Sequence, residues 1–321
     1  MKRNLLAIAI PALLVAGAAN ASIEVWNKDG NKLNVNGRVK ALNYVAVGSS
    51  DDANDKEGDD TTARLGFTGE TQVTDSLTGY GRAEWETKTG GASFKETRYA
   101  FAGLNFGEAG SIDYGRNDGV LKAITAYTDV LPEFGGDAAE NTWYVLSARS
   151  DAVLTYRNAA LVEGLSFALQ YADDKEYGNE GYGLNAQYEI LDTGLTVGAS
   201  YAQLSGDNGK SWNAGIKYDA NDLYLAAIYA QSKDMNVKGS EKVRGFEVVA
   251  QYGIDFEVGR LTPSVAYVQH KTRSPSDDLA KYVEAGVNYD FNKNLSAIVD
   301  YKFNLIDDTK DTLGLALIYQ F

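Results

Sequence analysis

Apolar and polar side chains alternate with a period of two along most of the chain. In residues 33–41, Leu, Val, Gly, Val and Ala occupy the odd positions between Asn, Asn, Arg and Lys, and residues 62–70 and 77–86 repeat the pattern. Further alternating segments begin near residues 165, 182, 195, 212, 223, 246, 261, 283, 295 and 313. Because successive side chains of a β-strand point to opposite faces, the pattern predicts strands with one apolar and one polar face.

The ends of these segments and the links between them indicate how the strands are arranged. Many apolar faces end in Tyr or Phe, as in the aromatic girdles of membrane barrels. Short links (74–76, 107–109, 192–194, 219–222, 292–294) alternate with longer polar loops (48–60, 173–180, 205–210, 232–242, 270–280, 304–311). We therefore predict an all-β fold, a transmembrane antiparallel β-barrel of about 16 strands. A large soluble antiparallel protein would explain neither the girdle nor the alternating loop lengths.

One connection, residues 117–147, has no sustained alternation. It contains Pro132, Gly135 and Gly136, and a stretch compatible with a short helix at 120–127. A long irregular loop in a compact domain is usually functional. Since a barrel offers a polar interior, we predict that this loop folds inward.

The N-terminus carries the features of a secretory signal peptide. Lys2 and Arg3 precede an apolar run, and Ala19-Asn20-Ala21 fits the small-x-small rule for cleavage. We expect cleavage after Ala21, which divides the chain into a signal peptide (1–21) and a barrel (22–321). Beyond the signal, no apolar run reaches the length of a spanning helix.

Charge and composition narrow the range of partners. The net charge is −14, and residues 1–21 contribute +2, so residues 22–321 carry −14 − 2 = −16. Such acidity argues against a nucleic-acid partner, which requires a basic surface. The chain contains no Cys and a single His, His270, which we place in an outer loop at the end of a strand. No motif indicates a metal site or a cofactor.

Ordered short motifs give a more specific indication. They are Asn27–Lys32 (NKDGNK), 63–67 (ARLGF), 77–81 (LTGYG), 101–104 (FAGL), 113–117 (DYGRN), 131–137 (LPEFGGD), 155–158 (TYRN) and the final Tyr319-Gln320-Phe321. The chain thereby resembles, over 22–321, the trimeric general diffusion porins of enteric and related Gram-negative bacteria, the OmpC and OmpF type. The resemblance implies a homotrimer in the outer membrane, in contact with its lipid and lipopolysaccharide.

The resemblance also implies a constriction, where acids on the inward loop face bases on the wall. By motif, the loop acids are Asp129 and Glu133, Glu84 is a further acid of the lumen, and the bases are Arg38, Arg64, Arg98 and Arg149. The alternation independently places Arg38, Arg64 and Glu84 on the polar face. It also places Arg82 there, and we assign no role to that residue.

Three departures from the family pattern concern the constriction and the trimer. Glu96 stands near a position that is often basic, and Asp118 stands where an aromatic residue is common. Both make the lumen more acidic than usual. The loop at 88–95 is short, which puts a latch onto a neighbouring subunit in doubt.

The expected activity is passive diffusion of ions and small hydrophilic solutes, with weak cation preference. An enzyme is the first alternative, but no motif pairs His270 with a serine or a carboxylate. A substrate-specific sugar channel would line its path with aromatics, whereas the Tyr residues here fall mostly in the lipid-facing register. An additional role as an adhesin stays open.

Overall fold

The structure is a computed structural model that describes residues 22–48, 57–89, 96–139, 143–173, 180–205, 208–237 and 240–321. The predicted signal peptide lies outside the described residues, as do 49–56, 90–95 and 174–179, which hold most of three predicted loops.

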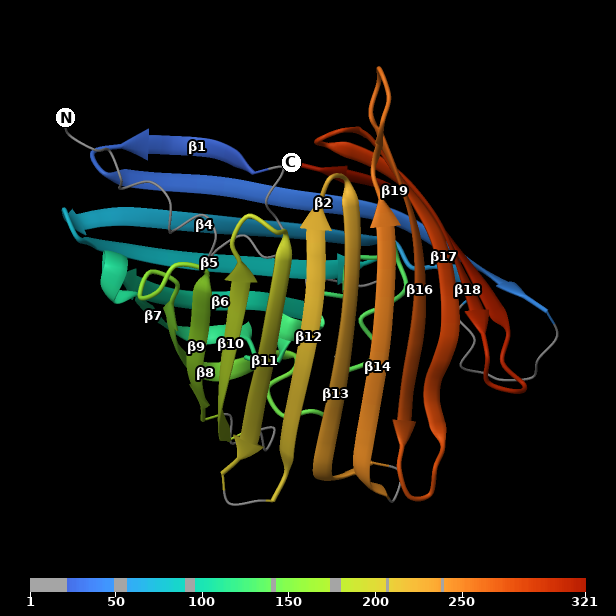
Figure 1. The fold of residues 1–321 in the computed structure, drawn as a ribbon. Coiled ribbons are helices and arrows are strands. Elements are labelled where there is room, and N and C mark those ends of the chain that lie inside the picture. The colour runs from blue at the N-terminus through green and yellow to red at the C-terminus, as the bar shows by residue number, and fades with distance from the viewer. Residues whose placement is uncertain are drawn as a thin grey trace.

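Within the described residues, sixteen strands form a closed antiparallel ring. They are β2 (Asn31–Val47), β4 (Thr62–Thr74), β5 (Leu77–Lys88), β6 (Glu96–Asn105), β7 (Ser111–Asp118), β8 (Arg149–Asn158), β9 (Leu165–Ala172), β10 (Gly181–Ile190), β11 (Leu195–Leu204), β12 (Lys210–Ala220), β13 (Leu223–Val237), β14 (Ser240–Tyr252), β16 (Arg260–Thr272), β17 (Asp278–Asn292), β18 (Leu295–Asn304) and β19 (Asp311–Gln320). Each strand pairs with the next along the chain (Figure 1). The predicted fold class and strand number are confirmed.

The ring closes where the two ends of the chain meet. The last strand, β19, pairs with β2 over residues 38–47, and the short strand β1 (Ile23–Lys28) pairs with the rest of β2. Gly37 and Phe321 exchange two backbone hydrogen bonds, of 2.7 and 2.9 Å. Closure satisfies the edge strands that an open sheet would leave unpaired.

Two further short strands, β3 (Gly58–Asp59) and β15 (Ile254–Asp255), extend the wall at its rims.

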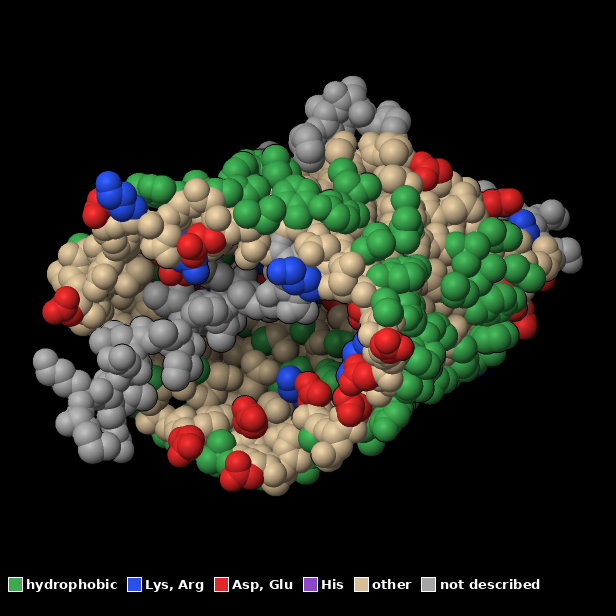
Figure 2. Space-filling view, turned by 90° about the horizontal axis from the view of Figure 1, so that it is seen from above, with side chains coloured by type: hydrophobic (Ala, Val, Ile, Leu, Met, Phe, Trp, Pro, Cys, Tyr) green, Lys and Arg blue, Asp and Glu red, His purple; other side chains and the backbone are tan. Residues whose placement is uncertain are grey.

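The outer and inner faces of the wall differ as the alternation predicts. Large hydrophobic side chains such as Phe67, Leu169, Val265, Val299 and Leu317 point outward and are exposed in the isolated chain. Figure 2 shows such side chains over the outer wall, with acidic and basic groups around the hollow inside. This is the polarity of a barrel with lipid outside and water within.

The links between strands alternate in length, although two of the longer loops are shorter than expected. Pairing continues from Lys233–Lys242 to Val237–Ser240, so β13 and β14 remain paired as a hairpin and the predicted loop 232–242 is mostly strand. Likewise, β16 reaches Thr272 and β17 begins at Asp278, so most of the predicted loop 270–280 is strand too. Polar side chains at these ends suggested loops, but a strand that extends beyond the membrane needs no apolar face.

The irregular segment after β7 folds into the barrel, as predicted. It contains the helical turn α2 (Lys122–Thr125), which contacts β11 and β12. Leu121 and Ile124 are fully buried against the wall. A second helical turn, η1 (Gly107–Ala109), lies in a short link. No helix in the described part of the chain has the length and apolar character needed to cross a membrane.

Candidate pore constriction

Polar side chains of the wall hold the first half of the inward loop. Asn213 of β12 donates to the carbonyl oxygen of Leu121 at 2.9 Å, and Gln251 of β14 donates to that of Val130 at 2.8 Å. The phenol of Tyr127 donates to Gln187 at 2.7 Å, and burial raises its pKa, which keeps it protonated as a donor.

Carboxylates of the wall hold the second half. Asp300 accepts hydrogen bonds from the backbone N–H groups of Glu133 (2.8 Å) and Phe134 (3.0 Å). Glu247 accepts from the N–H of Gly136 at 2.8 Å. Tyr282 donates to Asp137 at 2.7 Å, and both Glu247 and Tyr282 are fully buried. The wall therefore fixes the path of the loop through its backbone as well as through packing.

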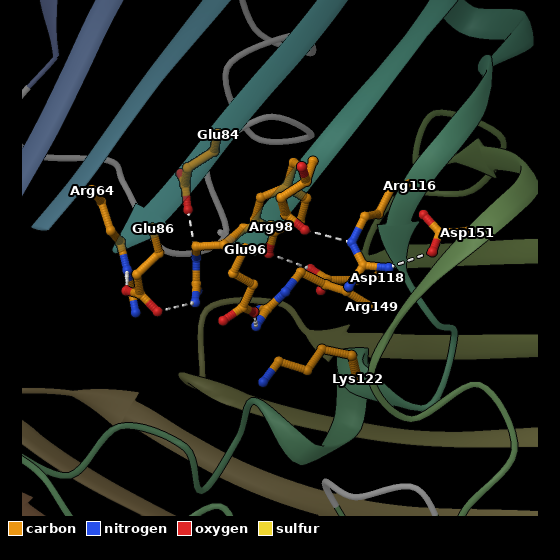
Figure 3. A network of polar contacts seen from close by, with 12 residues as sticks. Arg64, Glu84, Glu86, Glu96, Arg98, Arg116, Asp118, Lys122, Arg149 and Asp151 are labelled. Carbon is orange, nitrogen blue, oxygen red and sulfur yellow. Dashed lines mark hydrogen bonds and ion pairs between the residues drawn. The ribbon is translucent and has the colours of Figure 1, made fainter. Parts of the chain in front are cut away.

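Strand register places the basic residues in a row across neighbouring strands. Arg38 of β2 lies opposite Arg64 of β4, and Arg64 lies opposite Glu86 of β5. Arg64 and Glu86 form an ion pair, and Arg98 contacts the same carboxylate at 3.3 Å. Glu86 thus supplies a negative charge within the basic row (Figure 3).

A β-bulge between β5 and β6 brings Arg98 to the inner face. The register passes from Glu84–Tyr99 to Trp85–Thr97, so Arg98 is the extra residue of the bulge. Its guanidinium contacts Glu84 at 2.7 Å, and Arg82 contacts the other oxygen of Glu84 at 2.7 Å. Glu84 is therefore buried between two arginines instead of facing open water.

The fourth basic residue, Arg149, lies at the start of β8, opposite Asp118. Its guanidinium lies 3.8 Å from Glu96 and 5.6 Å from the centre of the Tyr99 ring. Tyr99 donates to Asp118 at 2.9 Å. Both residues that depart from the family pattern, Glu96 and Asp118, thus lie beside the predicted base.

The two predicted loop acids lie in different surroundings. Asp129 has a side chain that is 44% exposed and pairs with Lys122 of the same loop at 3.0 Å. The side chain of Glu133 is 10% exposed and contacts Lys40 and Tyr44 of β2. Asp129 therefore faces lumen water, whereas Glu133 joins the loop to the wall.

All seven residues expected at the constriction lie on the inner wall or the inward loop. Three further charged residues, Lys40, Glu86 and Lys122, contact them, and the sequence did not predict these three at the constriction. The alternation turns Lys40 and Glu86 inward and could have indicated them. Lys122 lies in the irregular loop, where no periodicity indicates the direction of a side chain.

His270 lies in β16 and not in an outer loop, which corrects the position expected from the sequence. It is 2% exposed, its Nε2 lies 3.3 Å from the hydroxyl of Tyr144, and its ring packs against Trp143 and Tyr144 of the loop. Its surroundings are those of a packing residue. Among the described residues, no cluster of His, Asp and Glu has a geometry that could hold a metal ion.

A closed barrel with an apolar outer wall and an inner wall narrowed by a charged loop defines a membrane channel. A family model described as Gram-negative porin matches residues 28–321. The chain belongs to this family, and it is therefore a porin of the outer membrane.

Similar proteins match this chain along its whole length. Outer membrane protein F of Serratia marcescens is 43% identical, and the outer membrane porin protein OmpD of Citrobacter koseri is 46% identical, each with 100% of both chains covered. The structure of Salmonella typhi OmpF in complex with daunomycin has a TM-score of 0.82 and 37% identity, covering 93% of this chain and 100% of that one. An anion-selective porin from Comamonas acidovorans shares the fold, with a TM-score of 0.69 at 17% identity, covering 91% and 100%.

Proposed function

We propose that this porin is a water-filled pore for passive diffusion of ions and small hydrophilic solutes, with a weak preference for cations. The observation that carries the proposal is the set of charged side chains that the loop and the wall bring together inside the barrel. Fixed charges around a narrow aqueous path bias ion passage without binding a solute tightly.

The residues proposed to act on passing ions and solutes are the acids Asp129, Glu133 and Glu84 and the bases Arg38, Arg64, Arg98 and Arg149. Their inward position and the ion pair between Arg98 and Glu84 support this assignment. Asp129 is the acid most open to water among the three, so we assign it the largest share of the cation preference.

The cation preference is also supported by the acidity of the chain as a whole. Residues 22–321 carry a net charge of −16, which makes the pore and its mouths attractive to cations.

Planar-bilayer recording of the purified protein tests the proposal. In a KCl gradient, the reversal potential should have the sign of a cation-preferring pore, and current should rise linearly with voltage over a modest range. Clear anion preference would refute the cation assignment, and saturable uptake blocked by one sugar would favour a substrate-specific channel.

We further propose a homotrimer. Ile23, Val25 and Trp26 of β1 are each about half exposed, on a strand whose residues are all exposed in the single chain. A neighbouring subunit would cover this surface. Current that closes in three equal steps in the bilayer would support the trimer.

Lipopolysaccharide is a proposed partner because of a basic band on the outer wall, at the end with the longer loops. Lys233 lies opposite Lys210 on one side and Lys242 on the other, and Arg244 lies opposite Lys271. By alternation these side chains share the outward register of Tyr229, Phe246 and Tyr267. Like charges directly opposite one another are unfavourable unless an anion lies between them, and lipid phosphates are such anions.

Neutralising two members of the band tests this contact. We expect the double variant Lys233→Gln, Lys242→Gln to retain less lipopolysaccharide on the purified protein than wild type, because two phosphate contacts are lost. The control is Lys293→Gln, in the short turn at the opposite rim. Equal retention by the two variants would remove the basis for the proposed site.

We also propose that residues 1–21 are removed on export and that the protein has no enzymatic activity. The relatives are channel proteins by name, and His270 is packed between the wall and the loop. N-terminal sequencing of the purified protein would test cleavage after Ala21. Solute flux that is unchanged in His270→Gln would support passive diffusion.

A further inference from the structure

Two charged residues of the constriction lie on the sides opposite to those that the family pattern implies. Lys122 is a cation on the loop expected to carry acids, and Glu96 is an anion on the wall expected to carry bases. Figure 3 shows Glu96 beside Arg149, with Lys122 of the inward loop close to this group of charged side chains. Each lies next to a predicted constriction residue, Lys122 at 3.0 Å from Asp129 and Glu96 at 3.8 Å from Arg149.

Exposure separates Glu96 and Asp129 from the other acids of the pore, whereas the side chain of Lys122, which pairs with Asp129, is only 17% exposed. The side chains of Glu84, Glu86 and Glu133 are only 5%, 13% and 10% exposed, and each contacts basic groups of the wall. They therefore act on a passing ion mainly as halves of compact ion pairs. Glu96 is 53% exposed and Asp129 is 44% exposed, so these carboxylates face the water through which ions pass.

Charge cancellation at this water-exposed part has a direct consequence for permeation. The ammonium group of Lys122 offsets the field of Asp129, and the carboxylate of Glu96 offsets that of Arg149. A fixed charge beside open water acts on mobile ions over about one Debye length, roughly 8–10 Å at physiological salt. The two counter-charges thus weaken the field between loop and wall, and each also shifts the ion preference of the pore.

We propose that Lys122 and Glu96 are specificity-determining residues of this pore, each setting the ratio of cation to anion permeability against its neighbour. Lys122 moves the ratio toward anions and Glu96 moves it toward cations. This inference rests on the proposed function, since it concerns the ion preference of the same constriction.

The test compares single neutralising substitutions in planar bilayers with a KCl gradient. Lys122→Gln should raise the ratio of potassium to chloride permeability by about twofold or more, as one unit charge roughly 8 Å from the ion path would do in water. Glu96→Gln should lower the ratio by a similar factor. Lys122→Arg, which keeps the positive charge, should have the wild-type permeability ratio.

Matched controls remove the same charges elsewhere on the inner wall. Lys217 of β12 lies over the Tyr127 ring at 5.3 Å, and Glu189 lies in β10 near a short turn. Lys217→Gln and Glu189→Gln should shift the ratio less than the two test variants do. Shifts at Lys122 and Glu96 that are no larger than those of the controls would overturn the proposal.

A folding defect and a failure of the proposed function can both be told apart from a failure of this inference. Heat-modifiable migration on SDS gels shows whether each variant forms a barrel. Either single substitution alone then decides the sign of the effect of its residue on the permeability ratio. The wild-type reversal potential tests the cation preference, whereas the inference depends only on differences between variants and wild type. An anion-preferring wild type in which Lys122→Gln still raises the ratio would refute the former and support the latter.

Discussion

Two carboxylates of the inward loop, both expected at the constriction from sequence motifs, differ in their access to water. Asp129 and Glu133 stand four positions apart in one loop, yet the exposed fractions of their side chains are 44% and 10%. Glu133 contacts Lys40 and Tyr44, whereas Asp129 contacts Lys122 at the edge of the lumen. We therefore expect Glu133 to contribute chiefly to stability and Asp129 to permeation.

Neutralising each carboxylate in turn tests this division. Asp129→Asn should lower the ratio of cation to anion permeability more than Glu133→Gln, because Asp129 faces the ion path. Glu133→Gln should instead destabilise the folded barrel by about 1.5–3 kcal/mol, the usual contribution of hydrogen bonds to a charged group. Reversal potentials and urea unfolding of the two variants provide the measurements, and each variant is the control for the other. Equal effects of the two on both quantities would contradict the division.

The sequence predicted the inner wall at the residue scale better than the contacts on it. Alternation turned Arg38, Arg64 and Glu84 to the polar face, and the structure places them there. Arg98 reaches the inner face only through the bulge at β5 and β6, which shifts the register and which alternation cannot indicate. The partner of each charge, such as Lys122 beside Asp129, depends on the path of the loop through the barrel.

At the scale of elements, the loop and the wall fit together where glycine permits a close approach. A Cβ atom on Gly245 of β14 would lie 1.8 Å from the carbonyl oxygen of Ala138, which belongs to the loop backbone. A Cβ atom on Gly314 of β19 would meet Glu133 at 3.4 Å, an ordinary van der Waals distance. Both glycines lie on the inner face beneath the same loop, but only Gly245 requires the absence of a side chain.

We therefore expect Gly245→Ala to displace the loop, while Gly314→Ala leaves it seated. Overpacking at such a contact costs about 1–3 kcal/mol, and the displaced loop would alter the width of the channel. Single-channel conductance and urea unfolding should both change in Gly245→Ala and stay near wild type in Gly314→Ala. A wild-type conductance in Gly245→Ala would show that the loop is not held at this contact.

The lengths of elements were predicted less well than their existence. Alternating apolar residues identified the spanning part of each strand, because only that part needs a lipid-facing surface. The extension of β13 to Val237 and of β14 from Ser240 is polar, and polarity outside the membrane is compatible with strand or loop. Backbone pairing decides between them, and pairing depends on the partner strand.

At the scale of the whole molecule, the barrel is compatible with an ion preference opposite to the one proposed here. The Comamonas acidovorans porin, anion-selective by its description, shares this fold at 17% sequence identity. The fold supplies an apolar exterior and an aqueous interior, and the side chains within the lumen supply the sign. The ion preference of the present pore must therefore be measured through its residues, such as Lys122 and Glu96.

The outer face of the wall is apolar and the inner face is polar, and this difference leads to a prediction about single substitutions in the wall. Val299 of β18 points outward, is 52% exposed in the isolated chain, and lies between Val287 and Leu315 of the adjacent strands. An arginine there would lie in hydrocarbon, at a cost of about 2–4 kcal/mol near the bilayer midplane. Val299→Arg should therefore lower the free energy of unfolding measured by urea titration in lipid vesicles.

The inward-facing variant Thr262→Arg, on β16, is the matched control, because its new charge would face lumen water. We expect it to unfold close to the wild-type urea concentration and to shift ion preference toward anions, whereas Val299→Arg should leave the ion preference of the surviving channels unchanged. Since both variants add one positive charge to a strand, only the direction of the side chain distinguishes them. If Val299→Arg and Thr262→Arg unfolded at the same urea concentration, the outer wall would not be in contact with hydrocarbon. The barrel would then not span the membrane as the proposed pore requires.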